Sequence, residues 1–259
     1  MQLRTAQWNI GGGKIRDAGS DPTADKSYWH SEGDGIAHIV ETLRWFEPHI
    51  ITLQETHANG ENVQAKTIAD ALGLKYFVND EYADSHVESG QRLGQAILSA
   101  FPITEHSFTL FENPKYRVER PDGEVWISHD KGIAKCTVDI GQPLVVETLH
   151  MFPFRRFGVD TKEETTVMQD ITDKIHSDAP LFLLQGDFNM DDKRLAEFLP
   201  DLFTDELEEI PLDQPTTPKG RYYDHIAYRG LKLKDARIID TVLTDHYPVC
   251  ATFEYQQEH

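Results

Sequence analysis

Short apolar runs that stop at a polar residue recur along the whole chain and restrict its fold more than any other feature. They cover residues 3–10, 50–54, 95–100, 133–140, 144–150, 181–185, 225–228 and 249–255, and each has the length and composition of a β-strand. Some of them, such as IITL at 50–53 and LFLL at 181–184, contain almost no polar residue. Because strands covered on both faces read this way, we expect sheets enclosed between other layers.

Helical periodicity lies between these runs. Apolar residues recur every three to four positions over 36–46, 65–72 and 167–175. Pro48 and Gly73 mark the ends of the first two segments, and Thr161–Glu164 has the pattern of a capping box before the third. The polar, glycine-rich stretch 11–35 is expected to be a long loop. Strands interleaved with helices predict an α/β fold.

Length and composition predict one domain. The 259 residues contain no repeat, low-complexity block or flexible linker, so we assign 1–259 to a single catalytic domain. An apolar run long enough to span a membrane is absent, and the N-terminus lacks the pattern of a signal peptide. Cys136 and Cys250 lie in strand runs, where buried thiols are expected. A disulfide framework is therefore excluded, and the prediction is a cytoplasmic protein.

The charge argues against one class of function. The chain has 44 acidic and 25 basic side chains, a formal net charge of −19. Such a chain should not bind duplex nucleic acid tightly through counterion release, although a local basic patch or a metal can still attract phosphate. Carboxylates crowd the segment 201–213, which we expect to be a solvated surface loop.

Polar side chains at the ends of the strand runs predict the chemistry. Asn9, Glu55, His150 and Asp187 follow such runs, whereas Asp224 and the pair 245–246 precede them. In α/β proteins ligands collect at strand ends, and oxygen ligands of this kind suit a hard divalent cation such as Mg²⁺. The sequence lacks the Cys/His spacing of a structural zinc site, the G-x-S-x-G elbow of serine hydrolases and a complete P-loop.

Seven short motifs, taken in sequence order, point to a known family. They are QWNI around Asn9, LQET around Glu55, GQAILS from Gly94, LHM around His150, QGDFN from Gln185, YDHI around Asp224 and TDHYPV from Thr244. Together they resemble the endonuclease/exonuclease/phosphatase superfamily, the deoxyribonuclease-I-like phosphoesterases. The resemblance runs from Asn9 to Phe253.

The resemblance implies a fold and a reaction. The fold is a four-layer α/β/β/α sandwich with two packed, mostly antiparallel sheets, classed as α/β or α+β. The reaction is a metal-dependent, in-line attack of water on a phosphate ester, with Mg²⁺ or Mn²⁺ as the cofactor.

The resemblance also implies roles for single residues, which we state here as expectations. The metal ligands would be Asn9, Glu55, Asp187 and Asp245. The catalytic residues would be Asp187, Asn189, His150, Asp224 and His246, with Asp224 orienting His246. Whether Asp187 or His246 takes the proton stays open.

The substrate is less constrained. Arg155, Arg156 and Arg221 lie near the motifs and are predicted to contact substrate phosphate; the alternative is that they balance the acidic surface. Abasic-site nucleases of the superfamily usually carry an acidic residue where this chain has Gly11, which disfavours that activity.

The sequence is therefore compatible with three functions. The first is a nuclease-type phosphodiesterase, with a phosphate-ester substrate that could be nucleic acid. The second is a phosphatase or phosphodiesterase acting on a small molecule or lipid headgroup. The third is a non-catalytic binding module of the same fold. A monomer is the default, because nothing in the sequence indicates an assembly.

Overall fold

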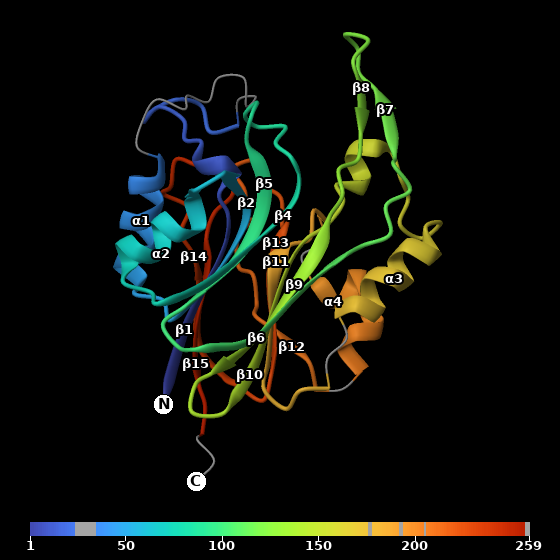
Figure 1. The fold of residues 1–259 in the computed structure, drawn as a ribbon. Coiled ribbons are helices and arrows are strands. Elements are labelled where there is room, and N and C mark those ends of the chain that lie inside the picture. The colour runs from blue at the N-terminus through green and yellow to red at the C-terminus, as the bar shows by residue number, and fades with distance from the viewer. Residues whose placement is uncertain (24–34, 176–177, 192–193, 205, 257–259) are drawn as a thin grey trace.

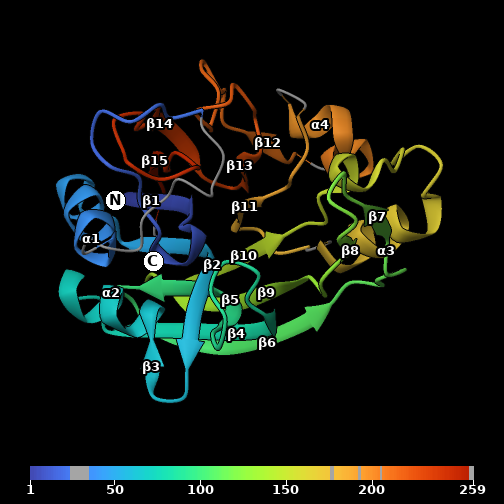
Figure 2. The ribbon, with the colours of Figure 1, turned by 90° about the horizontal axis from the view of Figure 1, so that it is seen from above.

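Two β-sheets pack face to face, and helices cover their outer faces (Figure 1). The computed structural model describes residues 1–23, 35–175, 178–191, 194–204 and 206–256. The predicted four-layer sandwich is confirmed. The N-terminus and the end of the described residues after β15 lie at the lower edge in Figure 1, opposite the edge where the polar strand ends gather. Figure 2 looks down on that second edge.

The first sheet has the order β14-β15-β1-β2-β5-β4, and β3 pairs with β2. Its strands are β1 (Gln2–Asn9), β2 (Ile50–Asn59), β3 (Asn62–Val63), β4 (Tyr76–Asp84), β5 (Arg92–Ser99), β14 (Lys232–Ile238) and β15 (Val249–Glu254). The pair β1–β2 is parallel and the others are antiparallel.

The second sheet has the order β12-β13-β11-β10-β9-β6. Its strands are β6 (Ile103–Leu110), β9 (Gly132–Asp139), β10 (Pro143–His150), β11 (Phe182–Asp187), β12 (Glu208–Glu209) and β13 (Asp224–Arg229). Only β10 and β11 are parallel among the described strands of this sheet. A separate hairpin of β7 (Arg117–Glu119) and β8 (Val125–Ile127) projects above the upper edge in Figure 1.

Four helices of the described residues supply the outer layers. The helices α1 (Gly35–Phe46) and α2 (Gln64–Leu72) pack on the first sheet, and α3 (Thr165–Ile175) and α4 (Leu195–Phe198) pack on the second (Figure 1). Short 3₁₀ turns occur at η1 (Gly11–Gly13), η3 (Phe154–Phe157) and η4 (Pro200–Thr204). Among the described residues, no helix combines the length and the apolar character needed to cross a membrane.

Strand alternation divides the space between the sheets into an apolar end and a polar end. On β1 the inward residues read Leu3, Thr5, Gln7 and Asn9, whereas Ala6 and Trp8 pack outward toward the helices. On β11 Leu183 likewise belongs to the apolar core between the sheets, and Gln185 and Asp187 follow it toward the site. The core therefore becomes polar as it approaches the edge that carries the site.

The parallel pairs explain why the predicted site residues meet. Because β1 and β2 run in the same direction, Asn9 pairs with Gln54, the residue before Glu55. Similarly, His150 pairs with Asp187 across the parallel pair β10–β11, and Asp187 pairs with Asp224 on β13. The ends of four strands and the middle of β2 thus reach one edge of the sandwich.

Several local expectations need correction. Strand β2 does not stop before Glu55 but continues to Asn59 through a bulge, since β5 pairs with both sides of it. The loop predicted over 11–35 begins with a 3₁₀ turn; residues 24–34 lie outside the described residues. Helix α3 begins at Thr165, because the Asp160 carboxylate caps the turn before it instead of Thr161 opening a helix.

The acidic segment is also more structured than the expected solvated loop. It contributes the edge strand β12, and Ile210 and Leu212 are buried in the core between the sheets. Asp205 of this segment lies outside the described residues.

Candidate functional site

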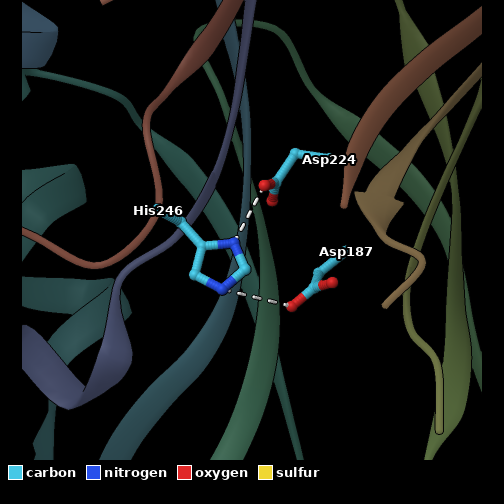
Figure 3. A group of neighbouring side chains, drawn as sticks. All are labelled: Asp187, Asp224 and His246. Atoms are coloured by element: carbon cyan, nitrogen blue, oxygen red, sulfur yellow. Dashed lines mark hydrogen bonds and ion pairs between the residues drawn. The ribbon is translucent and has the colours of Figure 1, made fainter. Parts of the chain in front are cut away.

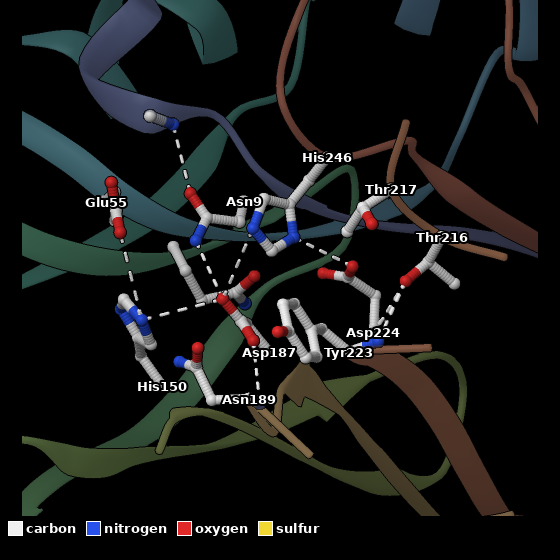
Figure 4. Close-up of polar contacts among 12 residues, drawn as sticks. Asn9, Glu55, His150, Asp187, Asn189, Thr216, Thr217, Tyr223, Asp224 and His246 are labelled. Atoms are coloured by element: carbon white, nitrogen blue, oxygen red, sulfur yellow. Dashed lines mark hydrogen bonds and ion pairs between the residues drawn. The ribbon is translucent and has the colours of Figure 1, made fainter. Parts of the chain in front are cut away.

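Seven of the predicted residues converge at the polar edge (Figure 4). Four lie at strand ends (Asn9, His150, Asp187 and Asp224), Glu55 lies at the bulge within β2, and Asn189 and His246 lie in loops. Six of them are buried, and Asn189 is half-buried. Their ring and carboxylate groups face one another across the gap between the two sheets, so the arrangement can surround a small polar group.

His246 bridges two carboxylates (Figure 3). Its Nδ1 lies 2.8 Å from Oδ2 of Asp224, and its Nε2 lies 3.8 Å from Oδ2 of Asp187. Burial alone lowers the pKa of His246, but Asp224 and Asp187 more than offset it and raise that pKa to about 10. The ring is therefore a cation at neutral pH. Its backbone carbonyl accepts hydrogen bonds from the Trp8 indole and the Thr244 hydroxyl, which fix its position.

Asp187 is held by two asparagines. The side-chain amide of Asn9 donates to Oδ2 at 2.8 Å, and the backbone N–H of Asn189 donates to Oδ1 at 2.8 Å. Burial raises the pKa of Asp187 to about 6, although His246 and these donors oppose the shift. A carboxylate with this pKa is mostly ionised at pH 7 yet can accept a proton, as a general base must.

The backbone is strained at two site residues. Glu55 and Asn189 both have a φ of 52°, in the left-handed region that non-glycine residues rarely occupy. At Glu55 the strain comes with the β-bulge: β5 pairs with Gln54 and Thr56 and skips Glu55. A bulge redirects one side chain relative to its neighbours, and here the redirected group is the Glu55 carboxylate, 3.9 Å from Nε2 of His150.

His150 differs from His246 in charge. Burial and the nearby Lys131 lower the pKa of His150 well below its ordinary value, so this ring is neutral. The Nζ atom of Lys131 lies 2.9 Å from Nδ1 of His150, and the Tyr82 hydroxyl lies 3.0 Å from the same nitrogen. Lys131, which is itself buried, brings positive charge to this side of the site. A phosphate contacting His150 would therefore meet a neutral ring backed by an ammonium group.

The oxygen groups of the site fit a hard cation. Glu55, Asp187 and the Asn9 amide supply the carboxylate and carbonyl oxygens that Mg²⁺ and Mn²⁺ prefer. Asp187, Asp224 and His246 also have donor atoms within 4.8 Å of one another. Asp224, however, already uses one oxygen for Gln7 and the other for His246, so it is poorly placed to be a ligand. Asn9 Oδ1 accepts the backbone N–H of Gly11, and both oxygens of Asp187 accept hydrogen bonds, so the predicted ligand set stays a prediction.

Asp245, the fourth predicted ligand, lies beside Gly11. A Cβ atom at position 11 would come within 3.2 Å of Oδ1 of Asp245, and Gly11 has a positive φ. The glycine found where abasic-site nucleases carry an acid therefore leaves room for the Asp245 carboxylate. Asp245 also contributes to the raised pKa of His246, so its charge is felt within the site.

The predicted substrate arginines pair with protein groups. Arg155 and Arg221 both bond to Oδ2 of Asp191, the first at 3.0 Å. Arg156 lies over the ring of Trp126 in the β7–β8 hairpin, 5.1 Å from its centroid. Their role in binding substrate stays a prediction.

Sequence reasoning missed Lys131, Tyr82 and Gln7. Lys131 immediately precedes the apolar run that forms β9, so the pattern that marked the other strand ends could have identified it. Tyr82 lies on β4, whose many exposed and half-exposed residues do not form the apolar run by which other strands were predicted. Gln7 lies within an apolar run, and nothing in the sequence indicates which residues its amide hydrogen-bonds to.

The sequence is similar to those of known proteins. The sequence model of the Endonuclease/Exonuclease/phosphatase family matches residues 6–246. A UPF0294 protein from Vibrio campbellii is 28% identical over 136 residues, which cover 50% of this chain and 47% of the relative. The chain thus spans about half the length of the curated relatives it matches first.

Two solved structures share the fold. An endonuclease/exonuclease/phosphatase from Beutenbergia cavernae gives a TM-score of 0.72 at 17% identity, covering 98% of this chain and 72% of the other. The 3′ phosphatase NExo from Neisseria, bound to a product DNA hairpin, gives a TM-score of 0.60 at 16% identity, covering 98% and 100%. At these identities the likeness concerns the fold.

Proposed function

We propose that the chain, which belongs to the Endonuclease/Exonuclease/phosphatase family, is a phosphoesterase that hydrolyses a phosphodiester by in-line attack of water. One observation carries the proposal: a cationic His246 and a buried Asp187 face each other at 3.8 Å, with Glu55 and His150 beside them. This set offers a base, a positive donor and oxygen ligands within one small site.

The pKa directions support a division of labour. Asp187 would accept the proton of the attacking water, since its pKa of about 6 suits a base at neutral pH. His246, whose pKa is raised by Asp224 and Asp187, would be protonated; oriented by Asp224, it would donate hydrogen bonds to the phosphate and a proton to the leaving oxygen as the bond from that oxygen to phosphorus breaks. Asn189 and Asn9 would keep Asp187 and the water in line.

The anionic phosphate would be held from the other side by Lys131 and His150. A phosphoryl transition state spreads negative charge over its oxygens, so fixed positive groups stabilise it. Glu55, Asn9, Asp187 and Asp245 would hold Mg²⁺ or Mn²⁺. When bound, the cation supplies positive charge and Lewis acidity to the phosphate oxygens.

Hydrolysis of bis(p-nitrophenyl) phosphate tests this proposal. We expect turnover with Mg²⁺ or Mn²⁺, none with a chelator, and a loss of at least about a thousandfold in Asp187→Ala and in His246→Ala. Asp122→Ala in the turn of the exposed β7–β8 hairpin is the matched control. Robust turnover by either Asp187→Ala or His246→Ala would contradict the assignment of the site.

For the substrate, a nuclease-type phosphodiesterase remains our first proposal, on the strength of the complete motif set. Local arginines and the cation would have to offset a net charge of −19. Cleavage of a single-stranded oligonucleotide should therefore slow as salt rises, with a modest slope, because the slope scales with the number of phosphate contacts and few are available.

A cavity beside Asn189 favours a second candidate, a small phosphate ester. It measures about 420 Å³, and Phe154, Val159 and Met190 line it together with Asp160, Asp191 and Arg155. Its lining has two carboxylates against one guanidinium, so it suits a neutral, polar group better than a second phosphate. A panel of oligonucleotides and sugar, nucleoside and lipid-headgroup phosphates discriminates the two: faster turnover of a small ester with little salt dependence would favour this candidate.

Two further proposals concern the whole chain. We propose that residues 1–259 act as one catalytic domain, because the two sheets share one core. We also propose a cytoplasmic location, since Cys136 and Cys250 are both free thiols buried in separate strands.

A further inference from the structure

A layer of buried amides and hydroxyls lies between the sheets, directly beneath the site. Gln185 accepts a hydrogen bond from Thr5 at 2.6 Å and donates to Thr52 at 3.1 Å. Gln54 donates to the Thr148 hydroxyl at 2.9 Å. An unsatisfied polar group at such a place is costly, so the hydrogen bonds that are made hold their members in defined positions; Oε1 of Gln7 and Oε1 of Gln95 have no hydrogen-bond partner among the described residues.

Gln7 is the one glutamine of this layer whose recorded side-chain contacts include a site carboxylate. Its Nε2 donates to Oδ1 of Asp224 at 3.1 Å and to Oε1 of Gln54 at 2.6 Å. Both hydrogens of the amide are thereby used, and the side chain is fully buried. The bond to Asp224 crosses from the first sheet to the second, since Gln7 lies on β1 and Asp224 on β13.

The contacts of Asp224 show what the bond from Gln7 does. Oδ2 of Asp224 faces Nδ1 of His246 at 2.8 Å, and the backbone N–H of Asp224 donates to Thr216. Oδ1 is held by Gln7. Because a carboxylate rotates about its last bond, fixing Oδ1 also fixes the direction in which Oδ2 points. The orientation of His246 therefore depends on an amide in the other sheet.

Three successive residues of β1 divide this work. Gln7 holds the Asp224 carboxylate, Trp8 donates to the backbone carbonyl of His246 at 2.9 Å, and Asn9 donates to Asp187 at 2.8 Å. Gln7 also bonds to Gln54, the neighbour of the bulged Glu55. One strand thus sets the relative positions of the acid–base groups and of the strand that carries Glu55.

We propose that Gln7 is a positioning residue of the reaction: its amide holds Asp224 so that Asp224 orients His246, and it ties this pair to the strand bearing Glu55. This inference rests on the proposed phosphoesterase function of the site. It adds a residue that contacts neither substrate nor cation.

Gln7→Met tests the proposal, with Gln185→Met as the matched control. Both changes remove an amide of the same size from the same buried layer, but the recorded partners of Gln185 are two threonines. We expect Gln7→Met to lower kcat for bis(p-nitrophenyl) phosphate by roughly tenfold to a hundredfold with little change in KM, as loss of a hydrogen bond to a charged group predicts. Gln185→Met should keep kcat within about twofold, because a lost neutral hydrogen bond in this layer affects folding rather than the site.

A spectroscopic measurement separates positioning from turnover. The proton between His246 and Asp224 should give a far-downfield nuclear magnetic resonance signal in the metal-free protein. We expect this signal to shift or broaden in Gln7→Met and to stay unchanged in Gln185→Met. If Gln7→Met does not fold, Gln7→Asn replaces it, since its amide is one methylene too short to reach Asp224.

The outcomes are distinguishable. A folded Gln7 variant with the wild-type kcat and an unmoved resonance would overturn the inference, and so would equal losses in the Gln7 and Gln185 variants. A wild-type protein that turns over none of the panel esters would instead overturn the proposed function, while the resonance would still report whether Gln7 positions the pair.

Discussion

The Nδ1 atom of His246 lies 2.8 Å from Oδ2 of Asp224, and both side chains are buried. Asp224 is the charge that most raises the pKa of His246 against the effect of burial. The pair therefore sets the protonation state of the ring, which in turn decides whether His246 can act as a base or as a cationic donor. Removing the charge of Asp224 should therefore change both the pKa and the role of His246.

Asp224→Asn keeps the shape of the side chain but removes its charge. We expect the pKa of His246 to fall from about 10 toward neutrality, because burial then acts with less opposition. We also expect kcat to fall by roughly a hundredfold to ten-thousandfold, as when the orienting acid of a histidine is neutralised. Titration of the imidazole resonances in the metal-free protein and steady-state kinetics check both. Asp235→Asn, in an exposed pair with Arg237, should change neither.

Lys131→Met should weaken phosphate binding. Lys131 is buried and its ammonium lies 2.9 Å from His150, whose pKa is so low that the ring carries no charge. Without the lysine this side of the site loses its ammonium group, and inhibition by inorganic phosphate should weaken by roughly tenfold or more. Lys66→Met, which breaks an exposed pair with Asp70, is the control. Equal inhibition of wild type and Lys131→Met would exclude this role.

How far the sequence predicted the molecule depends on what each residue contacts. Apolar runs such as 144–150 and 181–185 were predicted as strands and form strands, because their apolar composition indicates that they are buried. By contrast β6 was missed, since most of its residues are exposed and its pairing with β9 stabilises it instead. Asp187 was placed correctly at a strand end, but the bulge at Glu55 could not be foreseen because it arises from register with β5.

The same reasoning explains what was missed in the site. A motif marks residues that act in many relatives, so it pointed to Asp187, Asn189 and His246. Gln7 and Lys131 instead lie outside the motifs' key positions and contact site residues in the folded chain. Their partners, Asp224 and His150, lie 217 and 19 residues away, and a pattern of spacing along the sequence does not encode such contacts.

Glu55→Gln should weaken binding of the divalent cation. The carboxylate of Glu55 is turned toward His150 by the bulge, and it is the group that the family resemblance makes the principal ligand. An amide keeps one ligand oxygen but removes the negative charge, so we expect the affinity for Mn²⁺ to fall by roughly tenfold or more, with the fold unchanged. Calorimetric titration checks the affinity, and thermal melting checks the fold. Glu61→Gln, on the exposed turn after β2, should bind Mn²⁺ like wild type; unchanged affinity in Glu55→Gln would show that the cation lies elsewhere.

Glu147 predicts how stability depends on pH. Its side chain is fully buried on β10, with the half-exposed Lys135 as its ion-pair partner at 2.9 Å. Burial raises the pKa of Glu147 to about 8, although Lys135 opposes the shift. The native state therefore binds a proton more tightly than the unfolded state, whose pKa is near 4.3. This contribution to stability is complete below about pH 4 and is lost as the pH rises through 8.

Glu147→Gln removes this titration. Between pH 5 and pH 9, wild type should lose roughly 3 to 5 kcal/mol of unfolding free energy relative to Glu147→Gln. Urea unfolding of both proteins at the two pH values, without added metal, gives the difference directly. Glu105→Gln on the exposed face of β6 is the control, because its carboxylate is not desolvated. A difference between wild type and Glu147→Gln that stays constant from pH 5 to pH 9 would mean that Glu147 is already ionised in the folded protein, and that Lys135 compensates fully for its burial.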